Sequence, residues 1–189
     1  MWDNNRHAGY PIKKESEQNE SDYFKKYCRT IENFPKQGIN FRDVTPLLLT
    51  PQIFRQAIDK LCWESSKNTE AIVCIEARGF WIGFPMAYVL GVPIIPVRKK
   101  GKLPGKTAKI VYELEYGTDI LELHKDAIKP NQKILLVDDI LATGGTAKAV
   151  VNLVRELQGD VVGCCFLGEL VDLKGKDKLD VPVYSLIKF

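Results

Sequence analysis

The stretch that decides the fold reads Ile134-Leu135-Leu136-Val137-Asp138-Asp139-Ile140-Leu141-Ala142-Thr143-Gly144-Gly145-Thr146-Ala147-Lys148-Ala149-Val150. Its four branched apolar residues, 134–137, are typical of a short strand that is buried on both faces. Apolar residues then recur at helical spacing from Ala147 to Leu157, and Gly159 is a candidate C-terminal cap. The stretch therefore predicts a strand, a loop and a helix. Asp138 and Asp139 stand at the carboxyl end of the strand, where open α/β sheets bind ligands.

The loop of this unit has the chemistry of an anion site. Thr143-Gly144-Gly145-Thr146 would present backbone N–H groups at a helix N-terminus, and its glycines let a ligand come close to the main chain. It is not a P-loop, because no Gly-Lys-Ser/Thr sequence ends it. Two acids beside a phosphate site indicate hydroxyl groups or a bound cation, and a sugar phosphate supplies both phosphate and hydroxyls. The alternative is a capped helix that follows a core strand with solvated acids.

Composition limits the classes of protein to consider. The chain has 189 residues, of which 45% are hydrophobic and 27% charged, enough for one globular domain with a core. The net charge of +3 suits a polyphosphate ligand and is too small to indicate nucleic acid. The five cysteines form no C-x-x-C pair, which favours reduced thiols in the cytoplasm. No signal region and no apolar run of transmembrane length is present, so no membrane association is expected.

Strands and helices alternate along the chain, which predicts a three-layer α/β domain with a mostly parallel sheet. Residues 1–20 are polar and are expected to form a mobile extension. A helix is expected from Ser21 to Pro35, with Tyr23, Phe24, Tyr27, Cys28 and Ile31 on one face. One further helix is expected to begin at Thr50, and another is expected to follow Phe80 and end at about Leu90. Further strands are expected at residues 71–75, 92–97, 119–123, 161–167 and 183–187.

Two other segments carry chemistry. Glu76-Ala77-Arg78-Gly79-Phe80 is a second turn between a strand and a helix, and its arginine suits a second anionic group. In residues 98–106, five of nine side chains are cationic. That segment is either a solvated basic loop or a cationic lid, mobile when empty and ordered over a pyrophosphate. Residues 34–48 combine two prolines and a glycine with Ile39 and Phe41, and without further information they read as a hydrophobic hook that closes the core.

Together these segments resemble the type I phosphoribosyltransferases, and among them the adenine phosphoribosyltransferases. The resemblance covers residues 21–189 and is carried by five motifs: Phe41-Arg42-Asp43, residues 76–80, residues 98–106, Glu115-Tyr116-Gly117 and residues 138–146. It implies the three-layer α/β fold of that family, with a mostly parallel central sheet. It also implies a small N-terminal hood, residues 34–48, and a flexible lid, residues 99–112.

The resemblance implies a role for each motif. Asp138 and Asp139 would hold the ribose hydroxyls, and Glu115 would handle a proton on the purine. The 5′-phosphate would be held by Ala142, Thr143, Gly144, Gly145 and Thr146. The pyrophosphate would be held by Ala77, Arg78, Arg98, Lys99 and Lys102, with a cis peptide bond in its loop. Adenine would be held by Asn40, Phe41, Arg42 and Leu170.

The implied reaction joins adenine to 5-phosphoribosyl 1-pyrophosphate, giving AMP and pyrophosphate. Mg²⁺ would be bound mainly through the substrate and not by side chains, and a homodimer is expected from the family. Ala142 favours adenine over 6-oxopurines, because family members that use 6-oxopurines carry an aspartate there. The alternative is a regulator that binds phosphoribosyl pyrophosphate without catalysis, or an inactive paralogue. The lid and Glu115 favour the enzyme.

Overall fold

The computed structural model describes residues 17–65, 68–114 and 117–189, without the side chains of residues 113, 114 and 117. The chain divides into two compact units, Met1–Arg55 and Gln56–Phe189. Each unit is described by itself below. The predicted mobile extension lies outside the described residues as far as residue 16. Its last four residues were assigned wrongly, because Glu17 to Glu20 form the start of the first helix.

The first unit contains α1 (Glu17–Lys25), β1 (Arg29–Ile31), β2 (Phe41–Asp43), α2 (Thr45–Leu48) and the start of α3 (Pro51–Ser65). The prediction of a helix reaching Pro35 was wrong. A turn closed by the bond from Tyr27 N to Phe24 O, 3.0 Å, follows α1. The β-branched residues Thr30 and Ile31 then pair with β2 in an antiparallel hairpin, which suits their backbone preference better than a helix.

The second unit is built on a seven-stranded sheet in the order β5-β6-β4-β3-β7-β8-β9. Its strands are β3 (Ala71–Ile75), β4 (Ile94–Lys99), β5 (Thr107–Leu114), β6 (Gly117–His124), β7 (Lys133–Leu141), β8 (Asp160–Glu169) and β9 (Val183–Lys188). The five strands from β4 to β9 in this order are parallel, while β5 and β6 form an antiparallel hairpin at one edge. The predicted mostly parallel sheet is confirmed.

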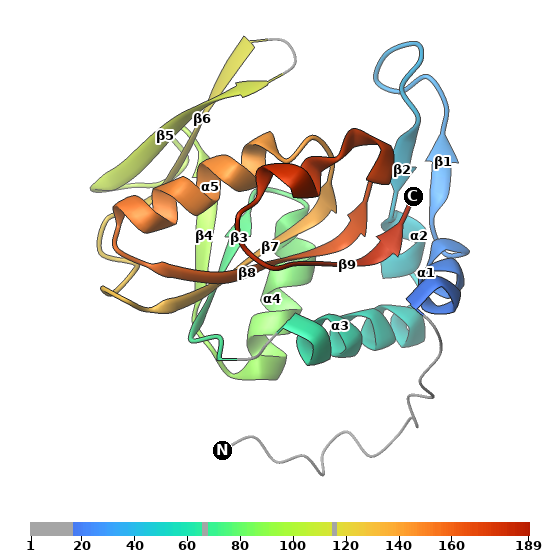
Figure 1. Cartoon of the computed structure of the whole chain (residues 1–189), viewed down its shortest axis with the longest axis horizontal. Helices are drawn as coiled ribbons and strands as arrows, with labels where there is room; N and C mark the ends of the chain where they lie inside the picture. Colours follow the sequence, from blue (N-terminus) through green and yellow to red (C-terminus); the bar gives the residue numbers. More distant parts are fainter. Residues whose placement is uncertain (1–16, 66–67, 115–116) are drawn as a thin grey trace. The chain divides into compact units, whose positions relative to one another are not determined.

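Helices α4 (Gly79–Leu90) and α5 (Gly145–Glu156) cover opposite faces of this sheet (Figure 1). Side chains of β3 alternate between the two faces. Val73 belongs to the core cluster that contains Val150 and Val154 of α5. Cys74 faces α4, where a Cβ atom at Gly83 would lie only 2.6 Å from the Cys74 Cβ. All five residues of β3 are buried, which explains why the strand is uniformly apolar.

The end of α5 differs from the prediction. Gln158, with φ of 64°, takes the left-handed position that was expected of Gly159. Gly159 follows it, and its N–H donates to Val154 O at 3.0 Å. A Cβ atom at Gly159 would lie 2.7 Å from Val154 Cγ1, so this glycine serves close packing.

Two short 3-10 helices, η1 (Val171–Leu173) and η2 (Gly175–Lys178), lie between β8 and β9. Among the described residues, no helix combines the length and the apolar character that crossing a bilayer requires.

All five cysteines are free thiols, as expected. Burial raises the pKa of Cys62, Cys74, Cys164 and Cys165 to about 12. Cys28 is only half-buried, and burial together with the nearby Asp43 raises its pKa to about 11. These thiols pack as small apolar side chains and are poor nucleophiles.

Candidate active site

The predicted phosphate loop, residues 142–146, joins β7 to α5. Gly144 precedes the helix in the left-handed region, with φ of 78°, and its carbonyl accepts the N–H of Lys148 at 2.9 Å. The first turn of α5 contains no acidic residue, and no side chain caps it. A helix start leaves its first N–H groups without intrahelical partners, so this loop can bind an anion. Ala142, Thr143, Gly145 and Thr146 are all partly exposed beside it.

Gly175 of η2 packs against this loop, a contact that was not predicted from the sequence. A Cβ atom at Gly175 would lie 2.1 Å from Ala142 O, and one at Gly144 would lie 2.3 Å from Gly175 O. The two backbones therefore touch where only glycine fits. Tyr112 of β5 also reaches the loop, where its hydroxyl forms a hydrogen bond with Thr146. Burial raises the pKa of this hydroxyl, and the bond with Thr146 opposes the rise.

The two predicted ribose acids stand together near the end of β7. Asp139 is 4% exposed, whereas Asp138 is partly buried. The Asp139 N–H donates to Asp138 Oδ1 at 2.8 Å. Burial and the neighbouring Asp139 charge raise the pKa of Asp138 well above its usual value. Burial also raises the pKa of Asp139, although Arg78 opposes this. Two adjacent carboxylates that are costly to ionise indicate a site that a ligand completes.

The predicted pyrophosphate loop begins beside these acids. The Glu76–Ala77 peptide bond is cis, as the resemblance implied. Arg78 follows it at the start of α4, and its Nε lies 2.9 Å from Asp139 Oδ2. Gly79 allows the helix to approach β7, because a Cβ atom there would lie 2.7 Å from Asp138 Oδ1. The loops after β3 and β7 therefore meet at the carboxyl edge of the sheet.

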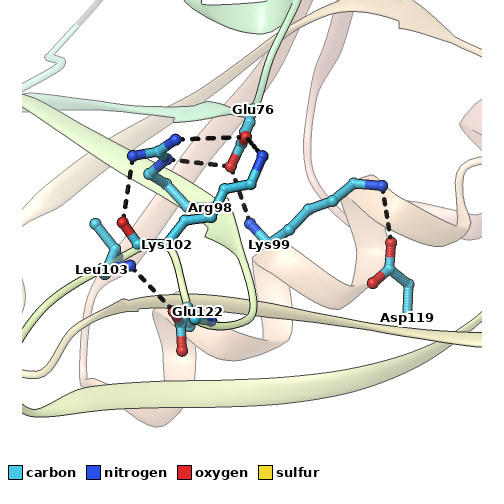
Figure 2. Close-up of polar contacts among 8 residues, drawn as sticks. Glu76, Arg98, Lys99, Lys102, Leu103, Asp119 and Glu122 are labelled. Atoms are coloured by element: carbon cyan, nitrogen blue, oxygen red, sulfur yellow. Dashed lines mark hydrogen bonds and ion pairs between the residues drawn. The ribbon is translucent and has the colours of Figure 1, made fainter.

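Three cations of this segment were predicted to hold the pyrophosphate, and each has a carboxylate partner: Arg98, Lys99 and Lys102 (Figure 2). Arg98 Nε lies 3.1 Å and Lys102 Nζ 2.5 Å from the Glu76 carboxylate. Lys99 Nζ lies 3.3 Å from Asp119 Oδ2. The sequence did not identify Glu76 or Asp119 as partners.

The lid turn, residues 100–106, is anchored by another acid that the sequence missed. Glu122 of β6 is 1% exposed, and its Oε1 accepts the N–H groups of Gly101 at 2.8 Å and Leu103 at 3.3 Å. Its Oε2 accepts the Thr107 hydroxyl at 3.2 Å and lies 3.5 Å from Lys109 Nζ. Burial raises the pKa of Glu122, but these donors outweigh it and hold the pKa below its usual value. Of the rest of the predicted lid, Lys99 ends β4 and residues 107–112 belong to β5.

Three of the four predicted adenine contacts lie in the first unit. Asn40 is exposed, while Phe41 and Arg42 are partly buried in β2. The Phe41 ring packs edge-on against Phe34, with ring centroids 5.3 Å apart, and Arg42 donates to the Thr30 hydroxyl. Of the predicted hood, residues 34–48, residues 41–43 form β2, which pairs with β1, and residues 45–48 form α2.

Asp43 fixes the end of that hairpin. Its side chain accepts the Thr45 N–H at 2.9 Å and pairs with Arg29. Burial raises its pKa, but the bonds from Thr45 and Arg29 lower it below its usual value.

Leu170, the fourth adenine contact, lies in the second unit directly after β8, and its N–H donates to Leu141 O at 2.9 Å. Glu115, the predicted catalytic acid, lies outside the described residues. Within the part of the chain that is described, no three or more His, Cys, Asp or Glu side chains form a group that could hold a metal ion.

Known proteins share both the sequence pattern and the geometry. The family model of the phosphoribosyl transferase domain matches residues 47–187. An adenine phosphoribosyltransferase of Clostridium acetobutylicum is 53% identical over 163 residues, which cover 85% of this chain and 95% of the relative.

Solved structures agree. An adenine phosphoribosyltransferase of Thermoanaerobacter pseudethanolicus superposes with a TM-score of 0.86 at 48% identity, covering 89% of this chain and 99% of that one. The Saccharomyces cerevisiae enzyme of the same name gives a TM-score of 0.85 at 40% identity, covering 90% and 99%. That structure contains adenine and D-2,5-dideoxy-2,5-imino-altritol 1,6-bisphosphate.

The chain has an α/β sheet with a glycine-containing loop after β7 and paired acids at the sheet edge. The phosphoribosyl transferase family model matches most of the chain, so this protein is a phosphoribosyltransferase. Adenine phosphoribosyltransferases that share about half of their residues with this chain, over nearly their full length, identify the family more narrowly. The chain belongs to the adenine phosphoribosyltransferase family.

Proposed function

We propose that this protein transfers the 5-phosphoribosyl group of 5-phosphoribosyl 1-pyrophosphate to adenine, forming AMP and pyrophosphate in purine salvage. The observation that carries the proposal is the meeting of two loops at one sheet edge. The loop after β7 offers a phosphate site and two acids, and the loop after β3 offers Arg78, which pairs with Asp139. A sugar carrying phosphate at one end and pyrophosphate at the other has the complementary charges.

Each group of residues has a task in this reaction. The loop at 142–146 holds the 5′-phosphate, and Asp138 and Asp139 bind the ribose hydroxyls. Fixing the sugar in this way lets the purine N9 approach C1 in line with the departing pyrophosphate. Cleavage of the C1–O bond places charge on that leaving group, and Arg78, Arg98, Lys99 and Lys102 stabilise it. Glu115 handles the proton that the purine releases.

The substrate enters as its Mg²⁺ complex in this proposal. When bound with the substrate, Mg²⁺ would neutralise part of the pyrophosphate charge and so supply electrostatic stabilisation of the leaving group. The four cations of the site each pair with a carboxylate, which offsets part of their positive charge. A metal ion bound to the pyrophosphate would supply further positive charge and so favour binding. Removal of Mg²⁺ with EDTA should abolish turnover, and added Mg²⁺ should restore it.

Adenine is the proposed base. Backbone groups at Asn40 and Arg42 offer donors and acceptors at fixed spacing, Phe41 and Leu170 provide apolar contacts, and Ala142 offers a methyl group where a 6-oxopurine enzyme needs an acid. The yeast relative was solved with adenine bound. Hypoxanthine reverses one donor–acceptor relation and leaves a buried group unpaired, at about 1–3 kcal/mol per lost bond.

An assay of pyrophosphate release with each base tests this proposal. Adenine should exceed hypoxanthine and guanine in kcat/KM by at least about two orders of magnitude, if two bonds are misread. Comparable values would refute the assignment of the base. A protein that binds phosphoribosyl pyrophosphate but releases none of its pyrophosphate with any base would be a non-catalytic regulator.

We also propose a cytoplasmic homodimer. One face of α4 exposes Trp81, Phe84 and Tyr88, of which Tyr88 is 88% exposed. These residues are spaced at three and four positions, so they share one face of the helix. Exposed aromatic residues grouped in this way are typical of protein interfaces. The five free thiols support a reducing compartment.

A further inference from the structure

We propose that Glu76 is a positioning residue of the pyrophosphate site: its buried carboxylate sets Arg98 and Lys102 in place to bind the substrate anion. The identity of that anion rests on the proposed function above. Glu76 directly follows β3 and directly precedes Ala77 and Arg78 of the pyrophosphate loop. The residue therefore joins this loop to Arg98 near the end of β4 and to Lys102 in the turn after it.

The geometry is that of a carboxylate shared among donors from three residues (Figure 2). Oε2 accepts Arg98 Nε at 3.1 Å and the Lys99 N–H at 3.1 Å. Oε1 accepts Lys102 Nζ at 2.5 Å and lies 3.5 Å from Arg98 Nη2. Both oxygens are engaged, so the positions of both cations are defined by one side chain.

Exposure separates the roles of the acid and the bases. The Glu76 side chain is 7% exposed, whereas the Arg98 and Lys102 side chains are 34% and 49% exposed. The carboxylate is therefore buried behind two cations that solvent still reaches. An ammonium has three donors and a guanidinium has five, so both can hold Glu76 and a ligand at once. This arrangement is expected of a support for binding groups.

Charge gives the arrangement its strength. Burial raises the pKa of Glu76, but hydrogen bonds from Lys102, Arg98 and Lys99 outweigh it and lower the pKa to about 2. The acid is thus ionised at any pH of interest. Arg98 and Lys102 would repel each other without the negative charge between them. The Lys102 side chain would then swing away into solvent, because it is 49% exposed, while Glu122 still holds the backbone on either side of it at Gly101 and Leu103.

Two substitutions in the full-length protein test the inference. Glu76→Gln keeps the shape of the side chain and removes its charge. Glu76→Asp keeps the charge and shortens the side chain by one methylene. Glu64→Gln is the matched control, because Glu64 forms an exposed ion pair with Lys60 on α3. Calorimetric titration with magnesium pyrophosphate gives the affinity, and initial rates give KM separately for phosphoribosyl pyrophosphate and for adenine.

Glu76→Gln should weaken binding of magnesium pyrophosphate by about tenfold or more, the effect of losing a charged hydrogen bond. The KM for phosphoribosyl pyrophosphate should rise in parallel, while the KM for adenine stays within about twofold of wild type. Glu76→Asp should lose less, about threefold, and Glu64→Gln nothing measurable. A merely structural role would instead raise both KM values together.

Undiminished pyrophosphate affinity in every Glu76 variant that folds would overturn the inference, as would tighter binding, which would show that the carboxylate competes with the substrate. Absence of pyrophosphate binding by the wild-type protein would also overturn it. The proposed function fails separately, if the wild-type protein binds magnesium pyrophosphate but forms no AMP from adenine. In that case the binding data still decide the role of Glu76.

Discussion

Asp138 and Asp139 show at the scale of single residues how a binding site opposes stability. Both carboxyls have a raised pKa, chiefly because of burial. An acid whose pKa is higher in the folded chain than in the unfolded chain binds protons more readily when folded. Its ionisation therefore destabilises the fold at neutral pH, and this penalty disappears as the pH falls through the folded pKa. A ligand that binds to the two carboxylates would offset this loss of folding stability.

Asp138→Asn should accordingly raise the melting temperature at pH 7.5 while abolishing AMP formation. A gain of about 1 kcal/mol corresponds to roughly 2–4 °C for a chain of this size. The difference between variant and wild type should narrow as the pH is lowered toward 4, because the wild-type carboxyl then becomes protonated. Thermal melts across this pH range measure it, with the exposed Asp172→Asn as control. A variant that melts below wild type at every pH would contradict this account.

Gly175 gives a second prediction for a single residue. Gly175→Ala should disturb the phosphate loop, because the new Cβ atom would meet Ala142 O at 2.1 Å. The loop must shift away, so the KM for phosphoribosyl pyrophosphate should rise by about tenfold or more, as expected for the loss of one or two anion contacts. Asp177→Ala, an exposed site in the same η2, is the control. Wild-type kinetics in Gly175→Ala would show that η2 shifts to accommodate the new Cβ atom and that the phosphate loop stays in place.

At the scale of elements, the lid turn depends on one acid of β6. Glu122→Gln retains the shape of the side chain but removes the charge that accepts the Gly101 and Leu103 N–H groups. Backbone hydrogen exchange in the peptide covering residues 99–106 should become faster, while exchange in β7 stays unchanged. Mass spectrometry of deuterium uptake checks both. Equal uptake in variant and wild type would mean that the turn is held by other contacts.

Elements that are buried on both faces were predicted well from the sequence. β3 and residues 134–137 of β7 consist of apolar residues that solvent does not reach, so their pattern has one interpretation. The region after α1 was predicted wrongly. Tyr27, Cys28 and Ile31 recur at helical spacing, but Tyr27 and Cys28 lie in the turn after α1, and Ile31 pairs with Phe41 of β2. That partner lies across a loop, and local periodicity carries no information about it.

The same reason separates the predicted from the missed parts of the site. Ala142 to Thr146 and Asp138 form one contiguous motif, which the sequence displays directly. Glu76 acts through residues 22 to 26 positions away. Gly175 meets Ala142 across another long interval, and its glycine looks like any other in a charged loop. Contacts between distant segments give these two residues their roles, and only the fold creates such contacts.

At the scale of the whole molecule, the exposed face of α4 sets the expected assembly. Tyr88→Glu should shift the protein from dimer toward monomer, because it places a charge in the proposed apolar interface. The fold of the monomer should be unaffected, because Tyr88 is 88% exposed there. Light scattering coupled to gel filtration measures the mass. Leu173→Glu introduces the same charge on η1 and should not change it. A monomeric wild-type protein, or a dimer that persists in Tyr88→Glu, would refute this interface.

The free cysteines have a practical consequence for following the lid in solution. With pKa values of about 11 to 12, fewer than about one in a thousand of these thiols is a thiolate at pH 7.5. A maleimide dye would therefore pass over them and react with a cysteine introduced by Lys106→Cys, an exposed position in the lid turn. The labelled protein would need no background mutations, and a change in its fluorescence on addition of phosphoribosyl pyrophosphate would test whether this turn closes as a lid.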